Sequence, residues 1–221
     1  MQDTNVSEEA RENYWNQFYG ARAKTLAVPS QFALFVLGET ADDCSIVDIG
    51  CGTGRDALYF SSQGRKVVGV DASVAGVEHC ARTAADNGLD ATFLASVVDS
   101  PSLADEIKRA SGSDGPNCVY ARFFIHAIND EEEQDFLTLA SHLCKDGDLL
   151  AVEFRTLRDA QLAKETGAHY RRYVNPLTFI HRAISHGFAS DYFVEGFGYA
   201  KYKNDDAHVA RCMLRKGPHG S

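Results

Sequence analysis

The sequence contains neither a long hydrophobic run nor a surplus of positive charge. No apolar stretch approaches the ~20 residues needed to cross a bilayer, and the acidic N-terminal stretch does not resemble a secretory signal or transit peptide. The 221 residues include 22 basic and 31 acidic side chains, giving a formal net charge of -9. Because nucleic-acid-binding proteins usually carry a basic surplus, we expect neither a membrane span nor a nucleic-acid partner.

The sequence also lacks paired cysteine motifs. Its six cysteines form no CxxC pair and show no spacing typical of a zinc site, so no bound metal is expected. Several lie in apolar runs, where a reduced thiol packs as a small hydrophobic side chain. Free thiols of this kind are typical of the cytoplasm. The composition, 44% hydrophobic and 24% charged, is that of a globular domain and excludes a disordered chain, a collagen-like repeat and a coiled coil.

Strand-like and helix-like segments alternate through the middle of the chain. The expected strands are residues 45–49, 66–70, 91–95, 117–121 and 148–154. The expected helices between them are residues 55–63, 73–86, 102–110 and 131–144. Such alternation predicts an α/β fold, with a parallel sheet covered by helices on both faces.

The ends of the chain add to this alternating core. A helix with one aromatic face is expected at residues 7–20, and a second after Ser30. Later segments predict a helix at 176–186 and two strands near 189–195 and 207–214, added antiparallel at the sheet edge. We therefore expect a single domain over residues 1–216, followed by a flexible tail at 217–221. Its parts are an N-terminal helical segment (1–40), the alternating core (44–155) and a substrate-side segment with edge strands (156–216).

The most informative motif is the glycine-rich turn in VDIGCGTGRD, residues 47–56. Glycine lets the chain turn sharply and lets a ligand approach the backbone closely, and the helix that follows offers free N–H groups. The spacing is GxGxG, one residue shorter than the dinucleotide fingerprint, which argues against an NAD-dependent oxidoreductase. Asp71 ends the next strand about 20 residues later, where an acidic residue can bind ribose hydroxyls. Asp99 follows the third strand, where a carboxylate can meet an adenine amino group.

The motifs VDIGCGTG, VVGVDAS and FLASVVD together resemble those of class I S-adenosylmethionine-dependent methyltransferases. The resemblance covers about residues 44–155. It implies a Rossmann-like, seven-stranded, mostly parallel sheet with an antiparallel last strand, an N-terminal helical lid, and S-adenosylmethionine as the cofactor. The cofactor-binding residues expected on this basis are Tyr14, Trp15, Ser30, Gly50, Cys51, Gly52, Gly54, Arg55, Asp71, Ala72, Val98, Asp99 and Ala121.

Further segments resemble one subgroup of that family. YWNQFY, PSQFA, ARFFIHAI and HYRRY resemble the methyltransferase module of bacterial O-antigen chain terminators, which methylate a phosphate on the terminal sugar of a polysaccharide. Related sequences also occur among natural-product methyltransferases. The resemblance implies a small-molecule or glycan-terminus substrate.

Basic side chains gather where the substrate should lie. Arg122 and His126 follow the fourth strand, and Arg155 ends the fifth, at the edge where open α/β sheets bind ligands. The irregular segment 156–175 adds to this cluster of expected catalytic and substrate-contacting residues His169, Tyr170, Arg171 and Arg172. Arginine forks match the oxygens of phosphate or carboxylate.

Each of these residues also has a purely structural interpretation. Arg122 could pair with a carboxylate in the acidic run 130–133, and His126 could be a buried, hydrogen-bonded core residue. The pair at 171–172 could be solvated loop charges, and Tyr14 and Trp15 could simply pack within their helix. These alternatives stay open at the level of sequence.

We expect methyl transfer to an oxygen of an anionic acceptor (phosphate or carboxylate) or a sugar-linked one. An anionic oxygen needs placement and charge compensation but no base, whereas a neutral hydroxyl or amine would need a base such as His126 or His169. The alternatives are an N- or O-methyltransferase of a small natural product, and a non-catalytic S-adenosylmethionine-binding protein.

Overall fold

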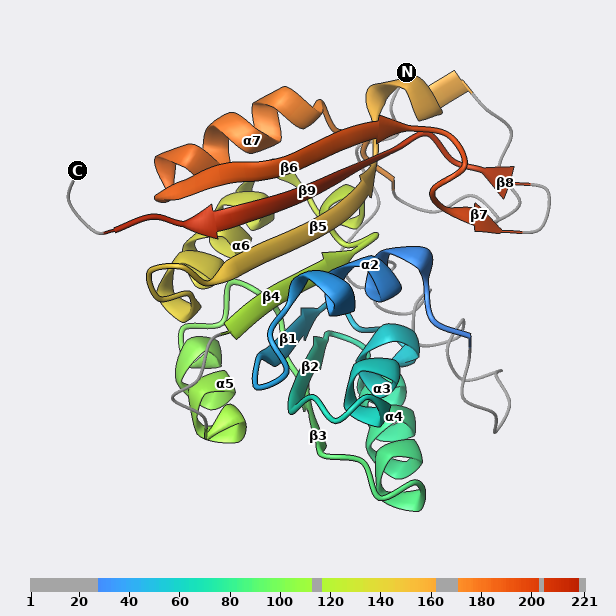
Figure 1. Cartoon of the computed structure of the whole chain (residues 1–221), viewed down its shortest axis with the longest axis vertical. Helices are drawn as coiled ribbons and strands as arrows, with labels where there is room; N and C mark the ends of the chain where they lie inside the picture. The colour runs from blue at the N-terminus through green and yellow to red at the C-terminus, as the bar shows by residue number, and fades with distance from the viewer. Residues whose placement is uncertain (1–27, 113–116, 162–170, 203–204, 219–221) are drawn as a thin grey trace.

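The computed structural model describes residues 28–112, 117–161, 171–202 and 205–218 (Figure 1). The helix expected at residues 7–20 lies outside these ranges. Within them, every expected strand and helix is present, with bounds shifted by no more than two residues. None of the described helices is long and apolar enough to cross a membrane.

Seven strands form one sheet in the order β3-β2-β1-β4-β5-β9-β6. Their bounds are β1 Ser45–Ile49, β2 Val67–Asp71, β3 Ala91–Ala95, β4 Asn117–Arg122, β5 Leu149–Arg155, β6 Phe188–Gly196 and β9 Val209–Lys216. Strands β1 to β5 pair in parallel, whereas β9 pairs antiparallel with both β5 and β6. The Rossmann-like sheet with an antiparallel last strand is therefore confirmed, and that last strand lies inside the sheet while β6 forms its edge.

Helices cover both faces of the sheet (Figure 1). Their bounds are α2 Gln31–Glu39, α3 Arg55–Ser62, α4 Val74–Asp86, α5 Leu103–Ser111, α6 Asp130–Leu143 and α7 Pro176–Ser185. The larger core joins α5, α6 and α7 to one face, around the fully buried Phe136, Phe154 and Phe179. The smaller core joins α2 and α3 to the other face, around Phe32 and Phe60. Burial of apolar side chains on both faces is what stabilises a parallel sheet.

Polar side chains fix where the helices begin. The hydroxyls of Ser30 and Ser73 accept the N–H of the third helical residue in α2 and α4, respectively. Helix α6 begins with a capping box between Asn129 and Glu132, and Asn175 caps α7 directly before its proline. These caps satisfy N–H groups that lack a partner inside the helix, so the first residue of each of these helices is well defined.

Short elements gather beyond the carboxyl ends of β4 and β5. They are the 3₁₀ turns η1 Ile125–Ala127 and η2 Leu157–Gln161, and the small two-stranded sheet of β7 Lys201–Tyr202 and β8 Asp205–Asp206. A bridge between Thr156 and Val174 brings the two described ends of the expected irregular segment together. The carboxyl edge of the sheet is thus where most of the non-repetitive structure lies.

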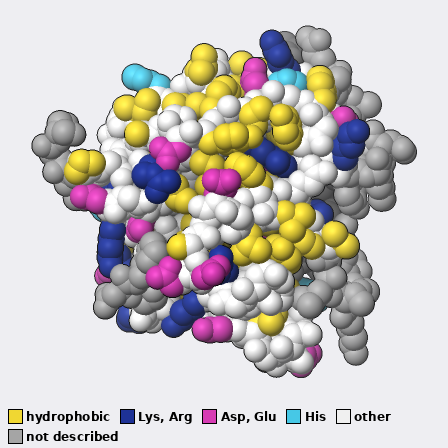
Figure 2. All heavy atoms as spheres, viewed as in Figure 1, with side chains coloured by type: hydrophobic (Ala, Val, Ile, Leu, Met, Phe, Trp, Pro, Cys, Tyr) yellow, Lys and Arg dark blue, Asp and Glu magenta, His cyan; other side chains and the backbone are white. Residues whose placement is uncertain are grey.

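The edge strand β6 leaves aromatic side chains partly exposed. Tyr192 on β6 packs against Phe35 of α2, with ring centroids 5.0 Å apart. The contact between Tyr192 and Phe35 ties β6, at the edge of the sheet, to α2, the first described helix. On the face of the molecule seen in Figure 2, hydrophobic side chains gather toward the middle, and charged side chains are scattered around them.

Candidate active site

The glycine-rich turn between β1 and α3 has a backbone that only glycine adopts readily. Gly50, Gly52 and Gly54 have φ values of 75°, 56° and 73°, in the left-handed region where a Cβ is disfavoured. A Cβ on Gly50 would lie 2.5 Å from the ring of Phe124, and one on Gly54 would lie 2.8 Å from Sγ of Cys80. Both the dihedral angles and the close neighbours therefore require glycine, and the turn exposes backbone where a ligand can approach it.

Asp71 at the end of β2 is hydrogen-bonded to this turn. One carboxylate oxygen accepts the N–H of Gly52 at 2.8 Å, and the other accepts the N–H of Ser73 at 2.9 Å. Burial raises the pKa of Asp71, and the two N–H groups act in the opposite direction. Each oxygen keeps a further lone pair that could accept a hydrogen bond from a ribose hydroxyl, and this role of Asp71 stays a prediction.

The remaining expected cofactor residues differ in exposure. Ala72 and Asp99 are exposed, and Asp99 lies in a turn four residues past the end of β3. Val98 packs partly against the larger core. Cys51 is 8% exposed, and Ala121 is fully buried. Tyr14 and Trp15 lie outside the described residues.

Ser30 and Arg55 hold the segment before α2 against α3. Ser30 donates both its N–H and its hydroxyl to the carboxylate of Asp56, each at 2.8 Å, and Tyr120 donates to that carboxylate at 2.7 Å. Nε of Arg55 donates to the carbonyl of Val28 at 2.7 Å. Ser30 therefore has a clear structural role. Asp56 and Tyr120 were not predicted as site residues. The acidic residue directly after Arg55, in the first turn of α3, is a signal that could have identified Asp56.

Asp48 on β1 is a buried carboxyl group beside two others. Burial raises its pKa well above its usual range, and the charges of Asp56 and Asp71 raise it further, while Arg122 acts in the opposite direction. The strand that carries the glycine turn therefore holds an acidic side chain at a cost in stability. Such a cost is typical of functional sites.

We expect the substitution Asp48→Asn to stabilise the protein without cofactor. A carboxyl group whose pKa rises on folding costs stability at any pH above its unfolded-state pKa, so the free energy of unfolding at pH 7 should increase when Asn replaces Asp48. In the wild type, stability should fall as pH rises from the unfolded-state pKa toward the folded-state pKa, because the native state binds the proton more tightly. Urea unfolding across pH checks both effects, and an Asn variant with an unchanged pH slope would contradict them.

Arg122 lies at the end of β4, the strand that pairs with β1 in the sheet. Its Nε donates to Glu153 at 2.8 Å, and 16% of the side chain is exposed. Burial alone would lower the pKa of Arg122, but the charge of Glu153 holds it above its ordinary value. Within the described part of the chain, its two terminal amino groups make no hydrogen bond.

Phe123, directly after Arg122, has a positive φ of 59°, which makes it the one non-glycine residue with a left-handed backbone among those described. Its ring lies 4.3 Å from the guanidinium carbon of Arg122 and 5.5 Å from that of Arg155. The ring of His126 meets it edge-on, with centroids 5.1 Å apart. Backbone strain of this kind costs about 1–3 kcal/mol and tends to occur at functional sites. The strained backbone thus brings three predicted site residues around one ring.

Arg155 and His126 are both engaged with the protein. The two terminal nitrogens of Arg155 donate to Asp159 and Asp205, each at 2.7 Å. The backbone N–H of Arg155 donates to Nδ1 of His126 at 3.2 Å, so that ring nitrogen carries no proton. His126 is 5% exposed, which matches the buried alternative considered for it.

Arg172 contacts the acidic start of α6. It donates to Asp130 at 2.5 Å and to Glu133, and Arg182 of α7 donates to the same two carboxylates. The backbone N–H of Arg172 also donates to the carbonyl of His126 at 2.8 Å. The pairing with α6 that sequence analysis considered for Arg122 is therefore made by Arg172. Arg171 is partly buried, and His169 and Tyr170 lie outside the described residues.

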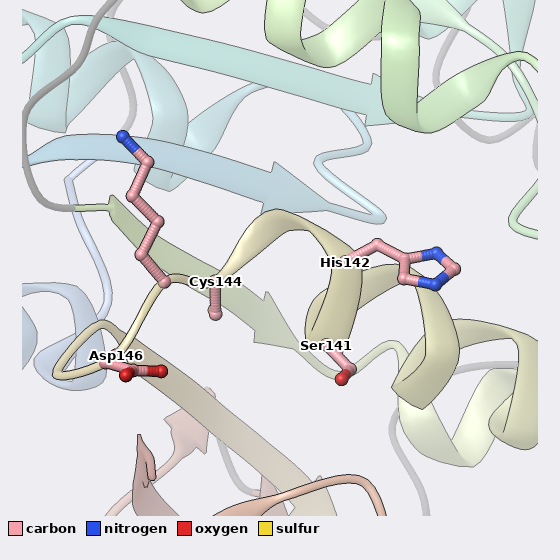
Figure 3. A pocket seen from close by; sticks show the side chains of 5 residues that line it. Ser141, His142, Cys144 and Asp146 are labelled. Atoms are coloured by element: carbon pink, nitrogen blue, oxygen red, sulfur yellow. The ribbon is translucent and has the colours of Figure 1, made fainter. Parts of the chain in front are cut away.

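A separate hollow of about 780 Å³ lies at the far end of α6, beside the turn into β5 (Figure 3). It is lined by Ser141, His142, Cys144, Lys145 and Asp146. Figure 3 shows Asp146 and His142 at opposite sides of the view, with the His142 ring directed away from Asp146. The hollow therefore lacks the convergent polar groups typical of a ligand site, and it adjoins the amino end of β5, opposite the residues described above.

Comparison with known proteins identifies relatives of the whole fold. Residues 19–190 match the model of a family described as a methyltransferase domain. A ubiquinone biosynthesis O-methyltransferase of Caulobacter vibrioides is 30% identical over 136 residues, which are 61% of this chain but only 50% of that protein. The chain thus spans about half the length of this curated relative.

Solved structures agree with the family match. A methyltransferase from Anabaena variabilis described as S-adenosylmethionine-dependent superposes with a TM-score of 0.71 at 16% identity, covering 96% of both chains. The 1,6-didemethyltoxoflavin N1-methyltransferase of Burkholderia thailandensis, solved with S-adenosylhomocysteine, gives a TM-score of 0.68 at 16% identity, covering 98% of this chain and 93% of the other. The class I fold expected from the glycine turn is confirmed, and the chain belongs to the methyltransferase domain family.

Proposed function

We propose that this protein transfers a methyl group from S-adenosylmethionine to an oxygen of an anionic or sugar-linked acceptor. The family match and the glycine turn support the cofactor: Gly50, Gly52, Gly54 and Asp71 would hold it, with Arg55 and Asp99 at the rim. Bound there, S-adenosylmethionine supplies an electrophilic methyl group, which the acceptor oxygen takes with a lone pair as the carbon–sulfur bond breaks and a neutral thioether is left.

The charge balance of three ionic clusters at the carboxyl edge supports an anionic acceptor. One cluster has one positive charge and two negative charges, and it consists of Arg155, Asp159 and Asp205. A second is balanced, and it consists of Arg172, Arg182, Asp130 and Glu133. The third has two positive charges and one negative, and it consists of Arg122, Arg211 and Glu153. Of the three clusters, only the one that contains Arg122 has more positive than negative charge, with Asp48 and Asp56 as further acidic neighbours of Arg122.

Arg122 is the residue that carries the proposal. Its terminal amino groups have no partner among the described residues, and they form a fork that suits two oxygens of a phosphate or carboxylate. Arg55 lies close to Arg122. Burial lowers the pKa of Arg55, and the positive charge of Arg122 lowers it further. Two neighbouring cations of this kind favour a bound anion. An acceptor oxygen that is already ionised needs only to be held in line with the methyl group, an effect worth up to about 7–11 kcal/mol in favourable cases.

Calorimetric titration is the first experiment. S-adenosylmethionine and S-adenosylhomocysteine should bind with micromolar affinity, and Asp71→Ala should weaken both by about tenfold or more, because a charged hydrogen-bond acceptor is lost. NAD should not bind. Binding of NAD in place of the other two would contradict the proposal.

Methyl transfer is then screened with radiolabelled S-adenosylmethionine. The panel pairs each anionic acceptor with a neutral analogue, sugar phosphates with free sugars and aromatic carboxylates with their amides, and it adds phenols and amines to represent natural-product acceptors. Turnover confined to the anionic members supports the proposal. Turnover of amines or neutral natural-product-like phenols would favour the second candidate, and cofactor binding without turnover would favour a non-catalytic binding protein.

A further inference from the structure

Three charged side chains lie side by side across neighbouring strands at the carboxyl edge of the sheet. In the parallel ladder of β4 and β5, Arg122 is opposite Glu153, and in the antiparallel ladder of β5 and β9, Glu153 is opposite Arg211. Residues directly opposite one another in a sheet have side chains on the same face. The order of the strands therefore places one carboxylate between two guanidinium groups.

The two oxygens of Glu153 are divided between the two arginines. Oε1 accepts from Nε of Arg122 at 2.8 Å, and Oε2 accepts from Nε of Arg211 at 2.7 Å. The Glu153 side chain is fully buried, so it has no water to replace either partner. Contact through Nε also leaves the terminal fork of Arg122 available to another group.

Arg211 is itself held in place from two directions. A terminal nitrogen donates to the carbonyl of Tyr199 at 2.8 Å. The guanidinium carbon lies 5.0 Å from the ring of Tyr199 and 5.3 Å from the ring of Phe32, within the range of cation–π attraction. Because Arg211 is fixed, the Glu153 carboxylate is fixed as well, and so is the orientation of the Arg122 fork.

We propose that Glu153 is a positioning residue, which orients Arg122 so that its terminal amino groups bind the anionic oxygen of the methyl acceptor. This inference rests on the proposed function. Glu153 touches no substrate in this scheme, and it acts only through Arg122. Arg122 alone would sample many rotamers, and fixing a long side chain before binding removes part of the entropic cost of binding.

Positioning and plain electrostatics make opposite predictions for Glu153→Gln. Removing a negative charge beside Arg122 makes the cluster more positive, so electrostatics alone would strengthen anion binding. Loss of the carboxylate that holds Nε should instead weaken it. Glu153→Asp keeps the charge and withdraws the carboxylate by one methylene, so it should weaken anion binding only if position matters.

The test uses the full chain, labelled with nitrogen-15 and saturated with S-adenosylhomocysteine. The Nε–H signal of Arg122 is assigned by its loss in Arg122→Lys, and it is followed by NMR during titration with inorganic phosphate. In wild type the signal should shift saturably. In Glu153→Gln and Glu153→Asp, the chemical shift of the Arg122 Nε–H before phosphate is added should lie nearer that of a free arginine. The affinity for phosphate should fall by about tenfold or more, as expected for a lost charged contact.

A matched control separates this effect from lost stability. Asp148→Asn changes another buried carboxylate, at the opposite end of β5, which accepts the N–H of Asn117 and Lys145. It should lower the melting temperature without moving the Arg122 signal or phosphate affinity. Affinity for S-adenosylhomocysteine should stay within about twofold in all variants.

The outcomes separate the two proposals. If wild type binds no phosphate, the anionic acceptor and this inference both fail. If wild type binds phosphate and Glu153→Gln binds it equally well or more tightly, only the positioning role is overturned. If Glu153→Gln does not fold, Glu153→Asp decides alone: wild-type affinity overturns the inference, and weakened affinity with a shifted Arg122 signal supports it.

Discussion

Replacing Glu133 by alanine is expected to lower the free energy of unfolding by about 3–5 kcal/mol, because the change removes one partner of a buried ionic cluster. The Glu133 side chain is 1% exposed and accepts from both Arg172 and Arg182. Without it, the largely buried guanidinium of Arg172 would keep Asp130, whose side chain is mostly exposed, as its one charged partner among the described residues. Urea unfolding followed by circular dichroism would measure the change.

The effect should reach the active site through backbone contacts. Arg172 donates its N–H to the carbonyl of His126 and a terminal nitrogen to the carbonyl of Ile125 at 3.1 Å. These contacts hold the η1 turn that follows β4. Glu133→Ala should therefore also raise the rate of amide hydrogen exchange in η1 before global unfolding, since local openings follow the loss of local contacts.

A neighbouring acidic residue supplies the control. Glu131 lies in the same first turn of α6 but is exposed. Glu131→Ala should change stability by no more than about 1 kcal/mol, the usual contribution of an acidic side chain near a helix N-terminus. Equal destabilisation by the two substitutions would contradict a special role for the buried cluster. Glu133→Gln, which keeps the volume, should fall between them.

The strands and the cofactor turn could be predicted because their signals are local. Runs such as residues 45–49 and 67–71 are rich in valine and isoleucine and end at glycine or aspartate, so strand type and strand end are both encoded within a few residues. The contact of Asp71 with Gly52 follows from the same logic. Two adjacent parallel strands that end at one edge must bring their following residues together.

The partners of the arginines could not be predicted in the same way. Arg155 meets Asp205, and Arg172 meets Glu133, across separations of 50 and 39 residues. Which acid meets which base depends on the order of strands and on the path of the segments between them. The sequence shows that several arginines gather at one edge of the sheet. It does not show that carboxylates on α6, η2 and β8 neutralise most of their charge.

The insertion of the last strand explains why Glu153 was missed. From sequence alone, Glu153 is an acidic residue within an apolar strand, and Arg211 lies in a strand expected only at the sheet edge. Placing β9 between β5 and β6 brings these two residues opposite one another. A charged residue in an otherwise buried strand is the one local signal that could have indicated a partner across the sheet.

Replacing Arg122 by glutamine is expected to lower kcat/KM for an anionic acceptor by about 100-fold, comparable to removing one donor that stabilises a charged reacting group. Affinity for S-adenosylmethionine should not change, because the contacts expected for the cofactor come from the glycine turn and Asp71. Arg122→Lys should give an intermediate value, since lysine keeps the charge but not the fork. Methyl transfer to the best acceptor from the screen provides the measurement.

An arginine on the same edge of the sheet provides the comparison. Arg158 lies in η2 with a largely exposed side chain, 3.9 Å from Glu195. Arg158→Gln removes the same charge from the molecule as a whole, so it should leave kcat/KM within about twofold, as surface pairs contribute little. If the two variants lose activity equally, the effect is one of net charge, and Arg122 has no particular role.

The pH dependence then distinguishes an ionised acceptor from a neutral one. A neutral hydroxyl must lose a proton during transfer, yet Nδ1 of His126 already accepts the N–H of Arg155, so a proton on that atom would break the contact. An acceptor that is already ionised needs no base, and Arg122 stays charged throughout the accessible pH range. We therefore expect kcat/KM to rise through the pKa of the acceptor and to stay level above it. If the pH profile of kcat/KM instead shows the same histidine-like pKa with every acceptor, the mechanism uses a general base. The acceptor oxygen would then be neutral before transfer, and the main argument for an anionic oxygen at Arg122 would fail.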